Sequence, residues 1–186
     1  MRPISTFSLL KAGRSTAISK NSFTGPARML ESVLPPVRGS AHDALSVFLG
    51  NWRAEGISFG GTDQSGADPK ANGVPWISTH SARWHTGDFF LIQDERARIG
   101  GTAFDTLSIM GVEPGDKGHF ARTFENHGFY RHYAFSVDGR TWLLEGATER
   151  ARTVFSANGN TQTITWEWLR EGLWLPLCDR VATRKT

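Results

Sequence analysis

Cysteine is almost absent from the sequence, since Cys178 is the single one among 186 residues. An internal disulfide is therefore excluded. A fold that is stable without one suits a reducing compartment, so we expect a cytoplasmic protein. Because Cys178 follows Pro176 and Leu177 and precedes Asp179, we interpret it as a small buried hydrophobe rather than a nucleophile.

Long apolar runs are absent as well. No stretch approaches the ~20 residues that a membrane-spanning helix needs. The run at residues 7–10 is too short for the apolar core of a signal peptide. Glycine-rich nucleotide loops, the nucleophile turn of hydrolases and the paired-histidine metal motif are also missing. We therefore expect a soluble protein without a membrane span, and no common motif assigns it a reaction.

Acidic residues are missing from the first 25 positions, and residues 1–40 carry six basic side chains against one acid, Glu31. The rest of the chain holds fifteen basic and seventeen acidic side chains, so nothing there indicates a nucleic-acid partner. We predict that residues 1–39 form a basic, largely disordered arm with a short helix at 26–34. The arm is either an upstream extension or, as its composition also allows, a mitochondrial transit peptide, which would target the protein to an organelle.

A sustained helical period is absent beyond residue 50. Before it, Ser40 suits a helix N-cap, Leu45 and Phe48 share one helical face, and Gly50 ends the helix. From Trp52 onward short strands alternate with turns, including hairpin signals at 138–139 and 158–159. With turn signals about every 8–12 residues, residues 40–186 are predicted to form an all-β, ten-stranded antiparallel up-and-down barrel with a short N-terminal helix.

Tyrosine is scarce, with two residues, but there are seven tryptophans and twelve phenylalanines, which need a large core or a lined cavity. On one expected strand Trp76, His80 and Trp84 share a face, and on another Trp166 and Trp168 do so. Interior placement of these rings avoids a large exposed apolar patch. We therefore predict a ligand-lining set that consists of Trp84, Trp166, Trp168, Phe89, His80 and His132.

Three polar side chains are candidates for a catalytic acid or base: Glu95, Tyr130 and His132. If its face is interior, Glu95 is a buried acid, and the alternative is an ion pair with Arg131 or Arg83. Tyr130 and His132 share one face of their strand, and either that face or the opposite one is interior. The paired histidines are five residues apart, on opposite strand faces, so we expect no metal site.

The segment Phe48-Leu49-Gly50-Asn51-Trp52 after a short helix resembles the Gly-x-Trp opening of the lipocalin and calycin superfamily. The hairpin at 135–142 is similar to that of bacterial lipocalin-like domains of unknown function. The resemblance implies a barrel whose closed end is plugged by Trp52, with Arg180 or Arg184 lying across the ring. Haem-binding barrels related to nitrobindin have an axial histidine near the C-terminus. This chain has none after His132, so we expect no cofactor.

Three functions remain open at this stage. The first is binding of a small apolar or aromatic molecule inside the barrel. The second is an enzyme of isomerase, cyclase or hydratase type that uses a cavity acid or base on a small hydrophobic substrate. The third is a homodimeric scaffold whose barrel is filled by its own side chains.

Overall fold

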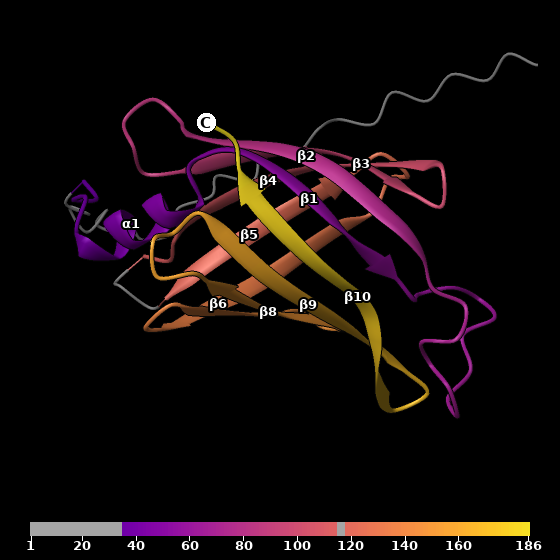
Figure 1. Cartoon of the computed structure of the whole chain (residues 1–186). Helices are drawn as coiled ribbons and strands as arrows, with labels where there is room; N and C mark the ends of the chain where they lie inside the picture. Colours follow the sequence, from indigo (N-terminus) through magenta and orange to yellow (C-terminus); the bar gives the residue numbers. More distant parts are fainter. Residues whose placement is uncertain (1–34, 115–117) are drawn as a thin grey trace, which may run out of the picture. The chain divides into compact units, whose positions relative to one another are not determined.

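The computed structural model describes residues 35–114 and 118–186, and in these residues the chain forms a closed antiparallel barrel of ten strands (Figure 1). Each strand pairs with its neighbours in sequence, and β1 pairs with β10 to close the barrel. The fold class predicted from the sequence is thus confirmed. The expected arm and the expected helix at 26–34 lie outside the described residues. The strands are β1 (Gly50–Ser58), β2 (Val74–Trp84), β3 (Leu91–Ile99), β4 (Thr102–Val112), β5 (His119–Glu125), β6 (Tyr130–Asp138), β7 (Thr141–Glu145), β8 (Glu149–Phe155), β9 (Thr161–Arg170) and β10 (Leu173–Arg184).

The tight turns follow from the backbone freedom of particular residues. Glu171 and Gly172 both have positive φ, +51° and +81°, which is the backbone of a two-residue hairpin turn between β9 and β10. In the hairpin between β6 and β7, Asp138 pairs with Thr141, so the two turn residues are 139–140 rather than 138–139 as predicted. The signal at 158–159 lies in a longer loop between Phe155 and Thr161.

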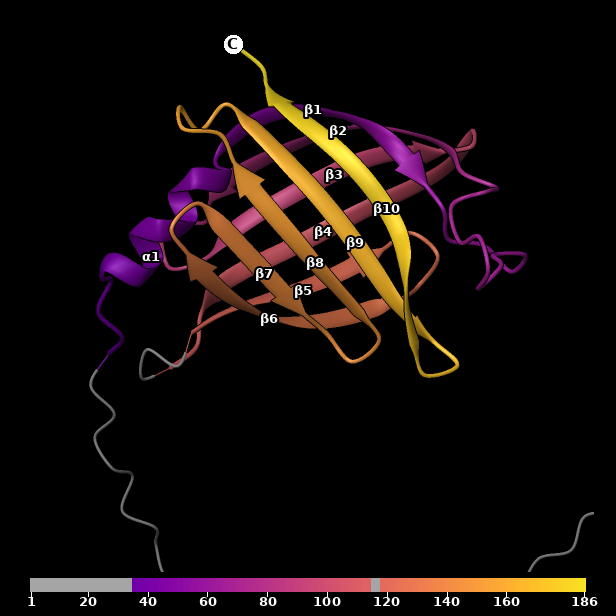
Figure 2. The same cartoon turned by 60° about the horizontal axis from the view of Figure 1, so that its bottom comes forward.

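A short helix, α1 (Ser40–Ala44), and a 3₁₀ turn, η1 (Leu45–Phe48), precede β1 and lie at one end of the barrel (Figure 2). The N-cap is Gly39 and not Ser40, because Ser40 already has helical backbone. Leu45 and Phe48 are buried, as their shared face predicted, and they close this end of the barrel core.

Trp52 lies beneath this helical plug with 1% of its surface exposed. Its indole N–H donates to the Phe48 carbonyl at 3.0 Å, which ties the ring to η1. The Arg184 guanidinium lies 4.1 Å from the centroid of the Trp52 ring and donates to the carbonyls of Leu49, Val47 and Gly159. Of the two arginines considered from the sequence, Arg184 is therefore the one over Trp52.

The opposite end of the barrel carries the long connection at residues 59–73 (Figure 2). A bulge in β10 at Leu177 anchors this loop, because the Leu177 carbonyl accepts hydrogen bonds from the backbone N–H groups of Phe59 and Gly60. Gln64 in the loop donates to the carbonyls of Pro69 and Pro176. None of the helices within 35–114 and 118–186 is long and apolar enough to cross a membrane.

Candidate binding cavity

The barrel holds a cavity of about 500 Å³ that is open to solvent and extends from the middle of the barrel to the end with the 59–73 loop. We call it the main cavity. Its walls come from nearly every strand, and loop residues Gly60 and Thr62 also contribute. A cavity of this size is within the range of small-molecule sites. It also means that the barrel is not filled by its own side chains.

The central part of one wall of the main cavity, on β3, β4 and β5, is built from polar side chains, and apolar side chains flank it on both sides: Met110 and Ala121 on one, Ile99 and Phe104 on the other. The register places Glu95 opposite Thr106 and Thr106 opposite Glu125. A second row runs parallel to it through Gln93, Ser108 and Thr123. We call this set the polar wall; it consists of Gln93, Glu95, Thr106, Ser108, Thr123 and Glu125.

The facing wall is aromatic. In the strand order of the barrel, β9 is five positions from β4 in either direction and so lies opposite it. Trp166 and Trp168 of β9 line the main cavity there, and we call them the aromatic wall. Trp168 is fixed by a 2.7 Å hydrogen bond from its indole N–H to Gln64. The Trp166 ring meets the Tyr133 ring edge to face at 5.4 Å.

A buried ion pair forms the floor of the main cavity. Arg180 donates to Glu95 at 2.9 Å, and the two side chains are 9% and 10% exposed. The Arg180 guanidinium also lies 4.3 Å from the centroid of the Trp76 ring. Gly56 lies between Arg180 and Trp76 in the register, and a Cβ there would be 2.0 Å from the Asp179 carbonyl oxygen. Glu95 therefore faces inward, and its partner is Arg180 rather than Arg131 or Arg83.

Beneath this ion pair lies a second, inner cavity of about 70 Å³, which Glu95 and Arg180 also line. His80 forms part of its wall and stacks on Trp52 with ring centroids 5.9 Å apart and an interplanar angle of 14°. Burial lowers the pKa of His80 to about 4, with a smaller opposing effect of Glu95 and a further lowering by Arg180. His80 is therefore a neutral imidazole near pH 7.

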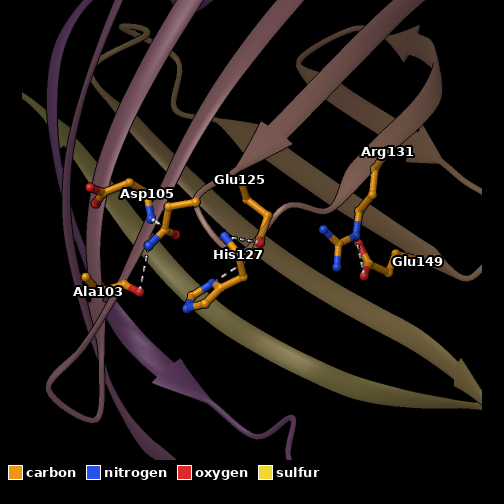
Figure 3. Close-up of polar contacts among 7 residues, drawn as sticks. Ala103, Asp105, Glu125, His127, Arg131 and Glu149 are labelled. Carbon is orange, nitrogen blue, oxygen red and sulfur yellow. Dashed lines mark hydrogen bonds and ion pairs between the residues drawn. The ribbon is translucent and has the colours of Figure 1, made fainter. Parts of the chain in front are cut away.

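The mouth of the main cavity holds a second charged cluster (Figure 3). Glu149 accepts hydrogen bonds from Arg131 Nε at 2.9 Å and from the Tyr133 hydroxyl at 2.5 Å. Burial and the neighbouring Glu149 carboxylate raise the pKa of Tyr133, so its hydroxyl stays protonated. Glu125, with a side chain 2% exposed, accepts from the backbone N–H of His127 at 2.8 Å.

The predicted ligand-lining residues separate into three places. Trp166 and Trp168 line the main cavity, and His80 lines the inner cavity. Trp84 and Phe89 lie toward the helical end instead: Arg38 covers the Trp84 ring, and Phe89 packs against His42 of α1. His132 is exposed on the outer face of β6.

The three catalytic candidates do not meet in the structure. Tyr130 is 57% exposed and shares the outer face of β6 with His132, whereas Arg131 and Tyr133 point inward. Tyr130 and His132 are thus outside the cavity, and Glu95 is the one candidate that lines it. Of the residues missed from the sequence, Thr106, Ser108 and Thr123 alternate along β4 and β5, but alternation alone does not say which face is interior.

Cys178 is buried, as expected from its neighbours, and it lines the main cavity between Trp166 and Trp76. Burial raises the pKa of the Cys178 thiol to about 11, so it is a protonated, weakly nucleophilic group near pH 7. Within the described residues, no group of three or more His, Cys, Asp or Glu side chains is arranged to hold a metal ion.

The chain is similar in fold to the crystal structure of Rv2717c from M. tuberculosis, with a TM-score of 0.58 and 15% sequence identity. The match covers 81% of this chain and all of that chain. At this identity the likeness concerns the barrel alone. No protein-family model matches the sequence, and no curated protein matches it.

Proposed function

We propose that the chain binds a small apolar or aromatic molecule in the main cavity. The observation that carries this proposal is the cavity of about 500 Å³ with the indole rings of Trp166 and Trp168 in its wall. Burying a guest against large rings is favourable at about 25 cal/mol per Å² of apolar surface removed from water. The polar groups around the rings orient the guest.

The test is quenching of tryptophan fluorescence by apolar ligands such as fatty acids, retinoids and haem, since Trp166 and Trp168 are in the cavity wall. We expect saturable quenching at micromolar concentration of an uncharged ligand such as retinol. Ala121→Phe fills the main cavity from β5 and should abolish it, whereas Ala134→Phe on the outer face of β6 should leave it unchanged. Saturation that survives Ala121→Phe, or no saturation with any ligand, contradicts the proposal.

The lipocalin-like, bacterial assignment belongs to the same proposal. Its support is the packing of Arg184 across the buried Trp52 ring at the closed end, which is what the Gly-x-Trp resemblance implies. A cytoplasmic location is likewise proposed, and it rests on the buried, unpaired thiol of Cys178.

An enzymatic role is the second candidate, and the cluster of Glu149, Tyr133 and Arg131 at the mouth favours it. The Glu149 carboxylate accepts from a protonated phenol and from a guanidinium, which is an arrangement that positions a proton-accepting group beside an apolar cavity. Recovery of every bound ligand chemically unchanged after long incubation, measured by mass spectrometry, would count against this role.

The homodimeric scaffold is supported by one feature of the outer surface. Leu107, Phe124 and Tyr130 lie opposite one another on β4, β5 and β6, and all three are exposed. The homodimeric scaffold was expected to have a barrel filled by its own side chains, and the main cavity argues against that part of the hypothesis. Sedimentation of the wild type and of Phe124→Glu at several concentrations would detect self-association through this row.

A further inference from the structure

The aromatic wall and the polar wall of the main cavity differ in chemistry, and this difference indicates the chemical class of the ligand. This inference rests on the proposed binding function and adds the chemistry of the ligand. We propose that the ligand is a neutral, hydroxylated aromatic ring system. Its ring face lies on the aromatic wall, and its hydroxyl groups point at the polar wall.

The aromatic wall on β9 and the polar wall on β3, β4 and β5 face each other across the barrel, because β9 and β4 are opposite in the strand order. Indole rings offer flat apolar surface on which an aromatic ring stacks or meets an edge. A guest held between these walls is therefore apolar on one side and hydrogen-bonding on the other.

The polar wall combines carboxylates, an amide and hydroxyls, so it offers acceptors and donors side by side. Ser108 and Thr123 lie 3.2 Å apart, and either can donate to the other. A hydroxyl both donates and accepts, so it suits such a mixed wall. A purely apolar guest makes no hydrogen bond to these groups and would bind less well.

Five charged side chains line the main cavity: Glu95, Glu125, Glu149, Arg131 and Arg180. Arg180 pairs with Glu95 and Arg131 pairs with Glu149, which leaves the Glu125 carboxylate without an arginine or lysine partner among the described residues. The cavity thus carries one net negative charge with histidine counted as neutral. An anionic ligand is repelled, whereas phenolic hydroxyls can donate to Glu125.

The experiment uses four naphthalenes of nearly equal shape, namely naphthalene, 2-naphthol, 2,7-dihydroxynaphthalene and 2-naphthoate, titrated into the full chain by calorimetry. We expect affinity to rise by about fivefold for each hydroxyl that finds a partner. We expect 2-naphthoate to bind more weakly than 2-naphthol. Equal affinity for naphthalene and the diol, or tightest binding of 2-naphthoate, overturns the inference.

Paired variants test the polar wall itself. Thr106→Val with Thr123→Val removes two hydroxyls at nearly constant volume and should reduce the ratio of diol to naphthalene affinity toward one. Naphthalene binding should persist in this variant, which shows that the barrel is folded. Thr163→Val on the outer face of β9 is the matched control and should leave the ratio unchanged.

The outcomes separate this inference from the function on which it rests. One outcome is that naphthalene binds and Ala121→Phe blocks that binding, while the affinity does not increase with the number of hydroxyl groups. In that case the cavity binds apolar guests, and the inferred ligand class is wrong. If none of the four compounds and none of the apolar ligands binds, the proposed function fails, and this inference fails with it.

Discussion

The buried imidazole of His80 makes the stability of the barrel depend on pH. Its folded pKa of about 4 is below the usual 6.5, so between these values the unfolded chain binds more protons than the folded one. The free energy of unfolding therefore decreases as the pH falls from 6.5 to about 4. We expect a loss of about 2 kcal/mol between pH 7 and pH 5.

Chemical denaturation at several pH values measures this dependence. His80→Gln removes the titrating group and should flatten the curve between pH 7 and pH 5, whatever it does to stability at pH 7. His132→Gln, at an exposed site on β6, is the control and should keep the wild-type slope. An unchanged slope in His80→Gln would assign the pH dependence to another group.

The ion pair of Glu95 and Arg180 should be costly to break from one side only. Arg180→Met leaves the Glu95 carboxylate buried without its partner, so we expect the unfolding free energy to drop by about 3–5 kcal/mol. Adding Glu95→Gln should restore part of that loss. The exposed outer pair of Arg53 and Glu55 gives the comparison, because Arg53→Met should cost less than about 1 kcal/mol.

At the scale of single elements, the Trp52 ring links β1 to η1 by packing and by a hydrogen bond. Trp52 packs against the plug, donates to the Phe48 carbonyl and lies beneath Arg184. Trp52→Ala should therefore lower the unfolding free energy by about 3–5 kcal/mol, as large-to-small core substitutions do. Trp174→Ala, at a partly exposed ring on β10, should cost clearly less in the same denaturation series. Equal losses would mean that the plug contributes little.

On β2 and β9 the sequence favours one face as the interior one, because the tryptophans of each strand gather on that face. Trp76, His80 and Trp166 accordingly point inward. The face of β6 could not be predicted in this way, since both of its faces carry aromatic and polar groups. It is fixed by register: Arg131 pairs with Thr123 and Tyr133 pairs with Ala121, both of which face the cavity.

Contacts between residues that are far apart in the sequence could not be predicted, for a related reason. Glu95 and Arg180 are 85 residues apart and lie on strands that are not neighbours in the sheet. Alternation predicts which side of a strand a residue faces, but it does not say which residue it meets across the interior. The polar wall depends on the same information, because its rows exist only once β3, β4 and β5 are in register.

For the whole molecule, the ladder that closes the barrel is contained in residues 50–184. From the sequence alone, residues 1–25 carry too little apolar surface to offset the entropy of ordering them. Deleting residues 1–25 should therefore change the melting temperature by no more than a few degrees, as measured by circular dichroism. A larger decrease would place part of the arm in the folded domain.

The main cavity also has a consequence for the volume of the molecule. Hydrostatic pressure favours the state of smaller volume, and folded proteins with internal voids lose that volume when they unfold. The difference in unfolding pressure between this barrel and a solid protein of equal stability therefore measures how much of the space of about 500 Å³ water leaves empty. A guest that occupies the space removes part of this difference. Binding of a guest should therefore raise the pressure at which the barrel unfolds.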